Sequence, residues 1–224
     1  MFLAETFTSI QGEGMLAGTP SFFIRTSGCN LRCAWCDTPY TSWNPEGQRH
    51  PVRDLLAAAE AASLRHVVVT GGEPLLQREL GELTRGLAAN GHHITVETAG
   101  TLVPEFDCHL LSLSPKTSNS DPEGPLLGRH RELRSAIEPL QRLVARHPEH
   151  QLKFVTRGED DIGEILELVQ RLGVARERVL LMPEGRSAAE VAARAPTVAR
   201  LCLERGFRYS PRLHLELFGN IRGF

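Results

Sequence analysis

Segments typical of buried strands alternate with segments typical of amphipathic helices along most of this 224-residue chain. The run His66–Thr70 is rich in β-branched residues and predicts a strand that is covered on both faces. Apolar residues at helical spacing over 52–62 and 162–172 predict helices that flank such strands. Because strands that alternate with helices pair in parallel through right-handed crossovers, the pattern predicts an α/β fold built on a parallel sheet.

The predicted strands number six, too few to close an eight-stranded barrel. They are Phe22–Arg25, His66–Thr70, Ile94–Glu97, Leu110–Leu113, Leu152–Val155 and Val179–Met182. We therefore expect a partial, incomplete TIM-like barrel of about six parallel strands. Further helices are predicted over Leu76–Ala89 and Ala188–Arg205, whereas the stretch Leu113–Gln151 is predicted to hold one helix at most. Helices should thus be fewer than strands, and we expect a single domain over residues 1–224.

Residues that can carry chemistry gather where the predicted strands end. Three cysteines follow the first strand, and Gly71-Gly72-Glu73-Pro74 follows the second. Glu97 ends the third strand, and Ser114-Pro115-Lys116 follows the fourth. The carboxyl ends of parallel strands share one face, which is where α/β barrels build their active sites. The sequence therefore predicts one active-site rim.

The three cysteines lie in the run Cys29-Asn30-Leu31-Arg32-Cys33-Ala34-Trp35-Cys36. Thiolates at this C-x3-C-x2-C spacing can hold three irons of a 4Fe-4S cluster, which leaves the fourth iron open to an added ligand. The alternative is a zinc ion with a fourth ligand such as His50 or Cys108. Structural zinc sites usually pair two C-x2-C-like halves, and the chain has no second half. Cys108 and Cys202 are predicted to be buried, inert thiols.

Composition restricts the partners and the location of the protein. Hydrophobic residues make up 41% and charged residues 23% of the chain, which suits one sizeable core. The formal net charge of −2 offers no basic field for nucleic acid, and no run approaches the ~18 apolar residues that span a bilayer. The first five residues lack the basic and apolar regions of a signal peptide. We therefore expect a cytoplasmic protein that binds neither nucleic acid nor membranes.

Several short motifs together resemble those of the radical S-adenosylmethionine enzymes, and among these the 7-carboxy-7-deazaguanine synthase family. The motifs are Ser9-Ile10-Gln11-Gly12-Glu13-Gly14, Arg25, Cys36-Asp37-Thr38, Thr70-Gly71-Gly72-Glu73-Pro74, Glu97-Thr98-Ala99-Gly100 and Ser114-Pro115-Lys116. The Gly-Gly-Glu-Pro run is shared by many enzymes of the superfamily, whereas its combination with Cys-Asp-Thr and Ser-Pro-Lys narrows the resemblance. This chain has the short cysteine spacing, while some family members carry a longer insertion between the first two cysteines.

The resemblance implies a reaction and its cofactors. A radical enzyme of this family converts 6-carboxy-5,6,7,8-tetrahydropterin to 7-carboxy-7-deazaguanine by ring contraction with loss of ammonia, in queuosine and 7-deazapurine biosynthesis. The implied cofactors are a 4Fe-4S cluster, S-adenosyl-L-methionine and Mg²⁺. The implied partners are the small pterin substrate and an electron donor such as flavodoxin or ferredoxin. We also expect a homodimer.

The resemblance further implies which residues bind each group. Cys29, Cys33 and Cys36 would hold the cluster, and Thr38 would bind Mg²⁺, an ion that keeps several of its waters. The residues implied for S-adenosylmethionine are Trp35, Cys36, Asp37, Gly71, Gly72, Glu73, Glu97, Ser114, Pro115 and Lys116. Those implied for the substrate are Ile10, Gln11, Gly12, Glu13, Arg25, Thr70, His214 and Phe224. A segment near residues 207–224 would cap the substrate.

Simpler structural roles remain open for several of these residues. Gly71 and Gly72 lack side chains, so the backbone there can approach a ligand closely, but an ordinary turn has the same requirement. Arg25 stands in an apolar strand and needs a partner, either the substrate carboxylate in a bidentate pair or a structural Asp or Glu. Thr38 could be a turn residue only.

Two other functions also remain open. An activase that abstracts hydrogen from a glycine of a partner protein would share the cluster motif, but would not need Mg²⁺. A non-catalytic zinc-binding module would contain neither iron nor sulfide.

Overall fold

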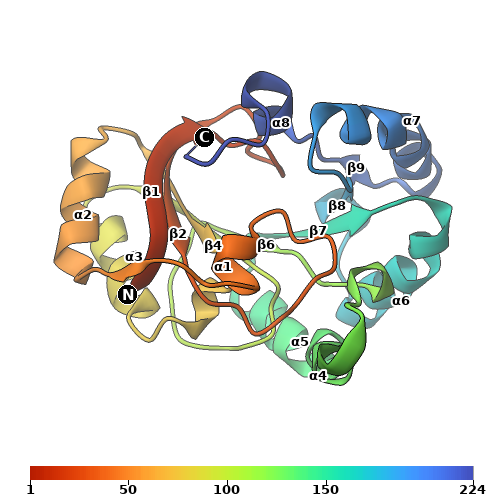
Figure 1. Cartoon of the computed structure of the whole chain (residues 1–224), viewed down its shortest axis with the longest axis horizontal. Helices are drawn as coiled ribbons and strands as arrows, with labels where there is room; N and C mark the ends of the chain where they lie inside the picture. Colours follow the sequence, from red (N-terminus) through yellow and green to blue (C-terminus); the bar gives the residue numbers. More distant parts are fainter. Residues whose placement is uncertain (224) are drawn as a thin grey trace.

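The computed structural model describes residues 1–223, which contain nine strands in one curved sheet (Figure 1). The strand order is β3-β1-β2-β4-β5-β6-β7-β8-β9. The strands are β1 (Phe2–Ile10), β2 (Pro20–Thr26), β3 (Gln48–Arg49), β4 (His66–Gly71), β5 (His93–Thr98), β6 (Leu110–Leu113), β7 (His150–Thr156), β8 (Val179–Pro183) and β9 (Arg208–Tyr209). Neighbours from β2 to β9 all pair in parallel, which confirms the six predicted strands as β2 and β4 to β8 and the partial barrel.

The sequence-based prediction missed three strands at the two ends of the sheet. β1 pairs antiparallel with β2, and the short β3 pairs antiparallel with β1. β9 adds only two residues beside β8. β1 is joined to β2 by a loop and not by a helix, so it falls outside the strand–helix alternation from which the other strands were predicted.

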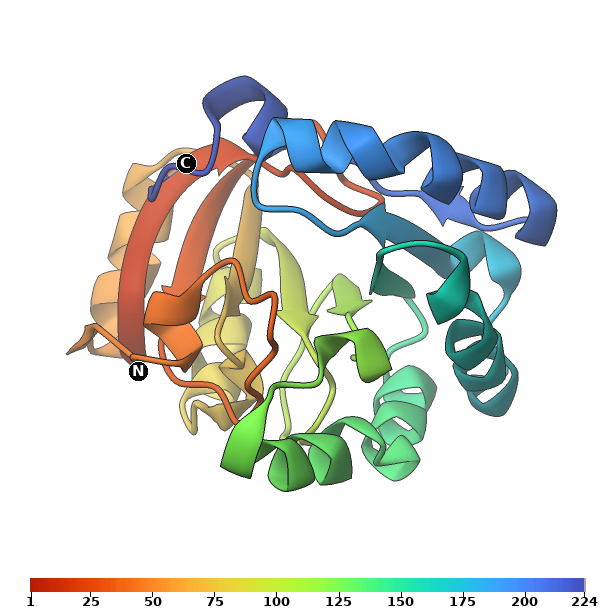
Figure 2. The ribbon, with the colours of Figure 1, turned by 45° about the vertical axis from the view of Figure 1, so that its right-hand side comes forward.

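Eight α-helices lie in the described part of the chain, one fewer than the strands, as predicted. They are α1 (Pro39–Ser42), α2 (Val52–Ala61), α3 (Leu80–Ala89), α4 (Leu127–Arg134), α5 (Ile137–Arg146), α6 (Ile162–Leu172), α7 (Ala188–Arg205) and α8 (Leu213–Phe218). Helices α2 to α7 surround the outer side of the sheet. The loop of residues 27–38, which carries the three cysteines and is called the cysteine loop below, lies with α1 across the open side of the barrel (orange in Figures 1 and 2). Within residues 1–223, no helix has both the length and the apolar character needed to span a membrane.

The prediction of at most one helix between Leu113 and Gln151 was wrong, because both α4 and α5 lie there. α5 buries Leu140 and Leu143 in the core. α4 is a short polar helix in which only His130 is buried, so it has no apolar periodicity to mark it. The helix predicted from Leu76 starts instead at Leu80.

The alternation of side chains along the strands separates the core from the interior of the barrel. In β7, Leu152 and Phe154 are fully buried in the core beneath the helices. Lys153, between them, points to the opposite face and lines the cavity described below. β2 does the same with Ile24 in the core and Arg25 toward the cavity. The fold thus places polar side chains of apolar strands inside the barrel.

Candidate active site

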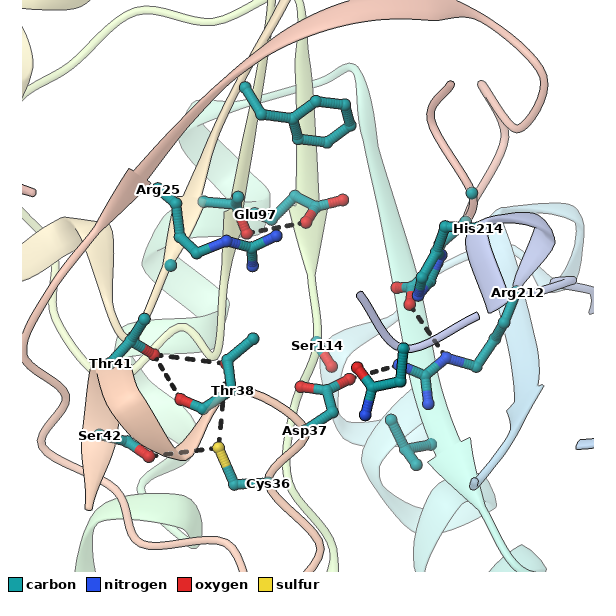
Figure 3. A pocket seen from close by; sticks show the side chains of 18 of the residues that line it. Arg25, Cys36, Asp37, Thr38, Thr41, Ser42, Glu97, Ser114, Arg212 and His214 are labelled. Atoms are coloured by element: carbon teal, nitrogen blue, oxygen red, sulfur yellow. Dashed lines mark hydrogen bonds and ion pairs between the residues drawn. The ribbon is translucent and has the colours of Figure 1, made fainter. Parts of the chain in front are cut away.

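A cavity of ≈ 490 Å³ lies among the cysteine loop, the carboxyl ends of the parallel strands and the C-terminal segment (Figure 3). Most of the site residues predicted from the sequence line it. These are Ile10, Gln11, Gly12, Glu13, Arg25, Cys29, Cys33, Trp35, Cys36, Asp37, Thr38, Thr70, Gly71, Gly72, Glu97, Ser114, Lys116 and His214. Glu73 and Pro115 do not line the cavity, and Phe224 lies outside the described residues. One rim therefore collects residues that are spread over most of the sequence.

The three cysteines of the loop between β2 and α1 are all free thiols. The Leu31 amide donates to Cys29 Sγ at 3.4 Å, and Cys36 Sγ lies 3.2 Å from Ser42 Oγ. Burial raises the pKa of Cys29 to about 12 and that of Cys33 to about 11, so thiolates here require a neighbouring cation. Soft sulfur donors of this kind suit the irons of a 4Fe-4S cluster, which binds each thiolate through a different iron.

Neither of the two residues considered as a fourth zinc ligand lies at the cysteine loop. Cys108 lies outside the cavity, with its Sγ 3.6 Å from His147 Nδ1. His50 lines a separate cavity beside Met1 and Glu79. Among residues 1–223, no three His, Cys, Asp or Glu side chains are placed to hold a single metal ion. A mononuclear zinc site at the cysteine loop is therefore not supported.

Gly71 packs against the end of β2 and Gly72 against the start of the cysteine loop, so their lack of side chains has a structural cause. Gly71 has a φ of 133°, and a Cβ added there would lie 2.1 Å from the Thr26 carbonyl oxygen. A Cβ on Gly72 would lie 2.2 Å from the Gly28 carbonyl oxygen. Only glycine allows this close approach, which packs the end of β4 against Thr26 of β2 and against Gly28, the residue before Cys29.

Glu73 is completely buried behind the cavity wall. Its carboxylate accepts hydrogen bonds from Thr98 Oγ1 at 2.5 Å and from the amides of Leu75 and Ala99 at 3.0 Å. Burial raises the pKa of this carboxyl group, against the effect of the three donors. Glu73 thus ties the loop after β4 to the loop after β5, a contact that differs from the predicted cofactor binding.

Ser114, Lys116 and Trp35 form one wall beside the cysteines. Lys116 Nζ donates to Ser114 Oγ at 2.6 Å and lies 5.6 Å from the centre of a Trp35 ring. The indole nitrogen of Trp35 donates to Asn119 Oδ1 at 3.1 Å. This wall offers a cation, a hydroxyl group and an aromatic face to a ligand.

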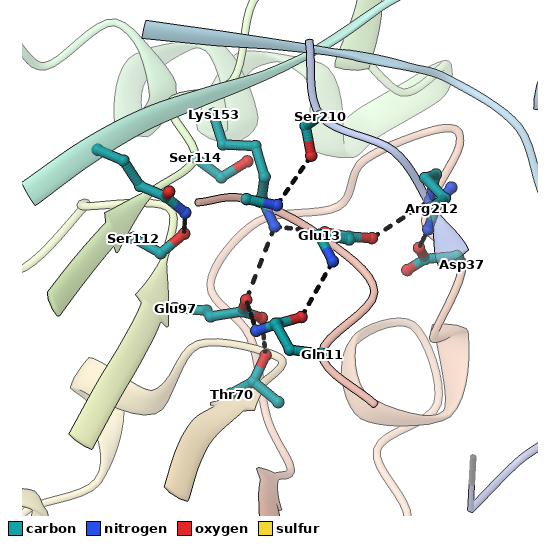
Figure 4. Close-up of polar contacts among 12 residues, drawn as sticks. Gln11, Glu13, Asp37, Thr70, Glu97, Ser112, Ser114, Lys153, Ser210 and Arg212 are labelled. Carbon is teal, nitrogen blue, oxygen red and sulfur yellow. Dashed lines mark hydrogen bonds and ion pairs between the residues drawn. The ribbon is translucent and has the colours of Figure 1, made fainter. Parts of the chain in front are cut away.

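A network of buried charges crosses the opposite side of the cavity (Figure 4). Glu97 accepts hydrogen bonds from Gln11 Nε2 at 3.1 Å and from Thr70 Oγ1 at 2.9 Å. Lys153 Nζ bonds to Glu13 and lies 3.7 Å from Glu97 Oε1. These two carboxylates outweigh the effect of burial and keep the pKa of Lys153 above its usual value.

The same network continues to Arg212, which stands one residue before α8. Arg212 Nε lies 3.2 Å from Glu13 Oε1, and its Nη2 bonds to Asp37. Although burial opposes ionisation, Lys153 and Arg212 hold the pKa of Glu13 far below its usual range. Sequence reasoning missed Lys153 and Arg212. The argument applied to Arg25, that a cation in an apolar strand needs a partner, would have identified Lys153.

Arg25 already has a structural partner, Glu5 of β1. Its Nε lies 2.9 Å from Glu5 Oε1, and its guanidinium carbon lies 5.1 Å from the centre of the Phe7 ring. Glu5 also accepts the Tyr40 hydroxyl at 2.7 Å. The structural alternative foreseen for Arg25 is therefore present, although Arg25 also faces the cavity (Figure 3).

Thr38 precedes α1 and lines the cavity two residues after the last cysteine of the motif. Its carbonyl accepts the Thr41 amide at 2.8 Å, and its Oγ1 lies 3.3 Å from Thr41 Oγ1. Thr38 thus forms a turn and at the same time presents a hydroxyl group to the cavity.

His214 of α8 covers the loop after β1. The Leu213 amide donates to the Gly12 carbonyl at 3.0 Å, and a Cβ on Gly12 would lie 2.1 Å from His214 Nδ1. The C-terminal segment therefore rests directly on the predicted substrate loop.

Comparisons with known proteins agree with this geometry. The family model of the radical SAM superfamily matches residues 23–121. The 7-carboxy-7-deazaguanine synthase of Rhodopirellula baltica is 45% identical over 227 residues, which cover 100% of this chain and 88% of the relative. The synthase of Halobacterium salinarum is 43% identical, covering 96% of this chain and 90% of the relative.

Among solved structures, QueE from Escherichia coli superposes with a TM-score of 0.69 at 27% identity, covering 93% of this chain and 92% of that one. SuiB from Streptococcus suis, at 14% identity and a TM-score of 0.58 over 84% of this chain and 47% of its own, shares the fold alone. The matches over nearly the whole length show that the chain belongs to the 7-carboxy-7-deazaguanine synthase family of radical S-adenosylmethionine enzymes.

Proposed function

We propose that this enzyme converts 6-carboxy-5,6,7,8-tetrahydropterin to 7-carboxy-7-deazaguanine with loss of ammonia, for queuosine or another 7-deazapurine. The observation that carries the proposal is that one cavity of ≈ 490 Å³ joins three thiols to a set of polar side chains suited to a small heterocycle. The C-terminal segment lies along this cavity through His214 and residues 219–223, which favours a small substrate over the glycine of a partner protein.

In this proposal the cysteine side of the cavity holds the cofactors. Cys29, Cys33 and Cys36 would bind the 4Fe-4S cluster. The wall that would bind S-adenosylmethionine consists of Trp35, Asp37, Gly71, Gly72, Ser114 and Lys116. When bound, these two groups supply one-electron chemistry that removes a hydrogen atom from the substrate. A reductant such as flavodoxin or ferredoxin would provide the electron.

The charged network would bind and orient the pterin. Glu97, which the resemblance assigned to S-adenosylmethionine, lies in this network and would bind the substrate instead. Its carboxylate, held in place by Thr70 and Gln11, could accept the N–H groups of the heterocycle. The Arg25 Nε lies 2.9 Å from Glu5 Oε1 in an ion pair, and the two Nη atoms would pair with the substrate carboxylate. Residues 207–223 would cap the substrate. Arg222, near the end of this segment, lines the cavity and pairs at 2.9 Å with Glu46 in the loop after α1, which holds the segment along the cavity.

Mg²⁺ would bind at Thr38 and at oxygens of the substrate. A neutral hydroxyl group is a weak ligand, but Mg²⁺ retains waters and is usually held by one or two protein groups together with its substrate. We further propose that the enzyme is a cytoplasmic homodimer that acts on the free pterin and not on nucleic acid.

The test is turnover by the iron- and sulfide-reconstituted, chemically reduced enzyme. With S-adenosylmethionine, Mg²⁺ and the carboxy-tetrahydropterin, we expect 7-carboxy-7-deazaguanine to form, as identified by mass spectrometry. Absence of the product from an enzyme with a full cluster would refute the proposed substrate.

The Mg²⁺ assignment is tested separately with Thr38→Ala. This variant should keep its iron and require more Mg²⁺ for half-maximal rate, whereas Thr197→Ala, outside the cavity, should follow the parent. If Thr38→Ala keeps the parent's Mg²⁺ curve at undiminished rate, Thr38 is a turn residue only.

A further inference from the structure

Arg212 joins three loops that each contribute to the cavity. As a whole residue, Arg212 is only 4% exposed. Nε faces Glu13 in the loop after β1, Nη2 bonds to Asp37 in the cysteine loop, and Nη1 donates to the Gly185 carbonyl after β8. Figure 4 shows Arg212 in contact with both Glu13 and Asp37. Because each of its three nitrogens contacts a protein partner, this arginine would act on a ligand through those partners.

The two carboxylates that Arg212 joins belong to different halves of the proposed site. Asp37 stands between Cys36 and Thr38, and Glu13 lies in the loop proposed to bind the pterin. The two carboxylates contact the same guanidinium group, so their like charges lie close together. A cation between them converts this repulsion into an attraction that holds the two loops together.

The two carboxylates depend on Arg212 to different degrees. Glu13 keeps a second cation, Lys153, on its other oxygen. Within residues 1–223, Arg212 is the only ion-pair partner recorded for Asp37. Loss of Arg212 would therefore leave the Asp37 carboxylate, whose side chain is 40% exposed, without its cation and free to turn toward solvent. The cysteine loop would then lose the tie that Arg212 gives it to the substrate loop.

We infer that Arg212 is a positioning residue that fixes the cysteine loop and the substrate loop in one mutual arrangement, so that S-adenosylmethionine and substrate favour each other's binding. The inference rests on the proposed function for the identity of the second ligand. Each ligand would stabilise the arrangement that the other requires, and by linkage the enhancement must be equal in both directions. Such alignment matters because a misplacement of about 1 Å can cost ~100-fold in rate.

A buried arginine could also be needed for folding alone, and the chain offers a matched control for that role. Arg134 of α4 also joins two carboxylates, with Asp121 at 2.7 Å and Glu164 at 2.8 Å. Its side chain is 10% exposed, against 5% for Arg212. Arg134 does not line the cavity. Arg134→Gln should therefore lower the melting temperature without changing the affinity for either ligand.

The experiment compares Arg212→Gln, Arg212→Lys and Arg134→Gln with the parent, all with reconstituted clusters under anaerobic conditions. The dissociation constant of S-adenosylmethionine is measured with and without the carboxy-tetrahydropterin, together with the melting temperature. We expect Arg212→Gln to weaken S-adenosylmethionine binding on the order of tenfold and to abolish the enhancement by the pterin. Arg212→Lys should recover stability but not the enhancement, since one ammonium group cannot span three loops.

Two results would overturn the inference. One is an Arg212→Gln enzyme that retains the parent's affinities and enhancement. The other is an equal loss of affinity in Arg134→Gln at a matched fall in melting temperature, which would mean that general destabilisation is responsible.

A parent enzyme that does not bind the pterin would refute the proposed function and not this inference. In that case the role of Arg212 is tested by the affinity for S-adenosylmethionine of Arg212→Gln, of Asp37→Asn and of the double variant. A double variant no weaker than Arg212→Gln alone supports action through Asp37, whereas independent, additive losses contradict it.

Discussion

Replacement of Glu73 by glutamine should destabilise the protein more than it affects its cofactor. Oε1 of Glu73 accepts bonds from Thr98 and the Leu75 amide, and Oε2 accepts the Ala99 amide. Glutamine offers only one oxygen, so its amide nitrogen must face at least one of these donors. The carboxylate is fully buried, and water cannot replace the lost acceptor.

The size of the effect follows from the number of donors left without an acceptor. One buried, unsatisfied donor costs about 1–3 kcal/mol, and the remaining bonds lose the strength that a charged acceptor gives. Relief of the penalty for burying a charge offsets part of this, since burial raises the pKa of Glu73. We expect a net loss of about 2 kcal/mol, which corresponds to a fall of roughly 4–8 °C in melting temperature for a chain of this length.

Differential scanning fluorimetry of Glu73→Gln, beside titration with S-adenosylmethionine, separates the two roles considered for this residue. The control is Glu82→Gln on the exposed side of α3, which should stay within about 0.5 kcal/mol of the parent. A variant with an unchanged melting temperature and a large loss of S-adenosylmethionine affinity would refute the structural role and restore the predicted cofactor contact.

Two further outcomes follow from the site. Cys33→Ala should abolish iron binding and activity, whereas Cys108→Ala should keep its iron content; loss of the cluster in the second variant would refute the assignment of three ligands. The pKa of Glu13 lies far below its usual 4.5 because Lys153 and Arg212 outweigh burial, so its contribution to stability is present above about pH 4.5 and is lost as the pH falls toward the folded-state pKa. Melting temperatures between pH 6 and 3 should therefore fall more steeply for the parent than for Glu13→Gln, and equal slopes would contradict this reasoning.

The central fold was predictable from the sequence because its signals are local. β-branched runs such as His66–Thr70 and the helical spacing over 162–172 depend on neighbours within a few residues. Once the strands are parallel, their carboxyl ends must share one rim, and this placed the cysteines, Gly71 and Ser114 at one cavity. α4 was not predicted, because it buries a single side chain and therefore shows no apolar residues at helical spacing.

The sequence by itself thus determined the parallel sheet, the cysteine spacing and which segments meet at the active-site rim. The tertiary structure alone decided which rim residues face the cavity and which hold the wall together. The Glu73 side chain points away from the cavity, and its carboxylate accepts three hydrogen bonds within the wall. Arg212 meets Glu13 across 199 residues, and Lys153 meets the same carboxylate across 140. Such pairs leave no local pattern, because it is the curvature of the sheet that brings the two side chains together.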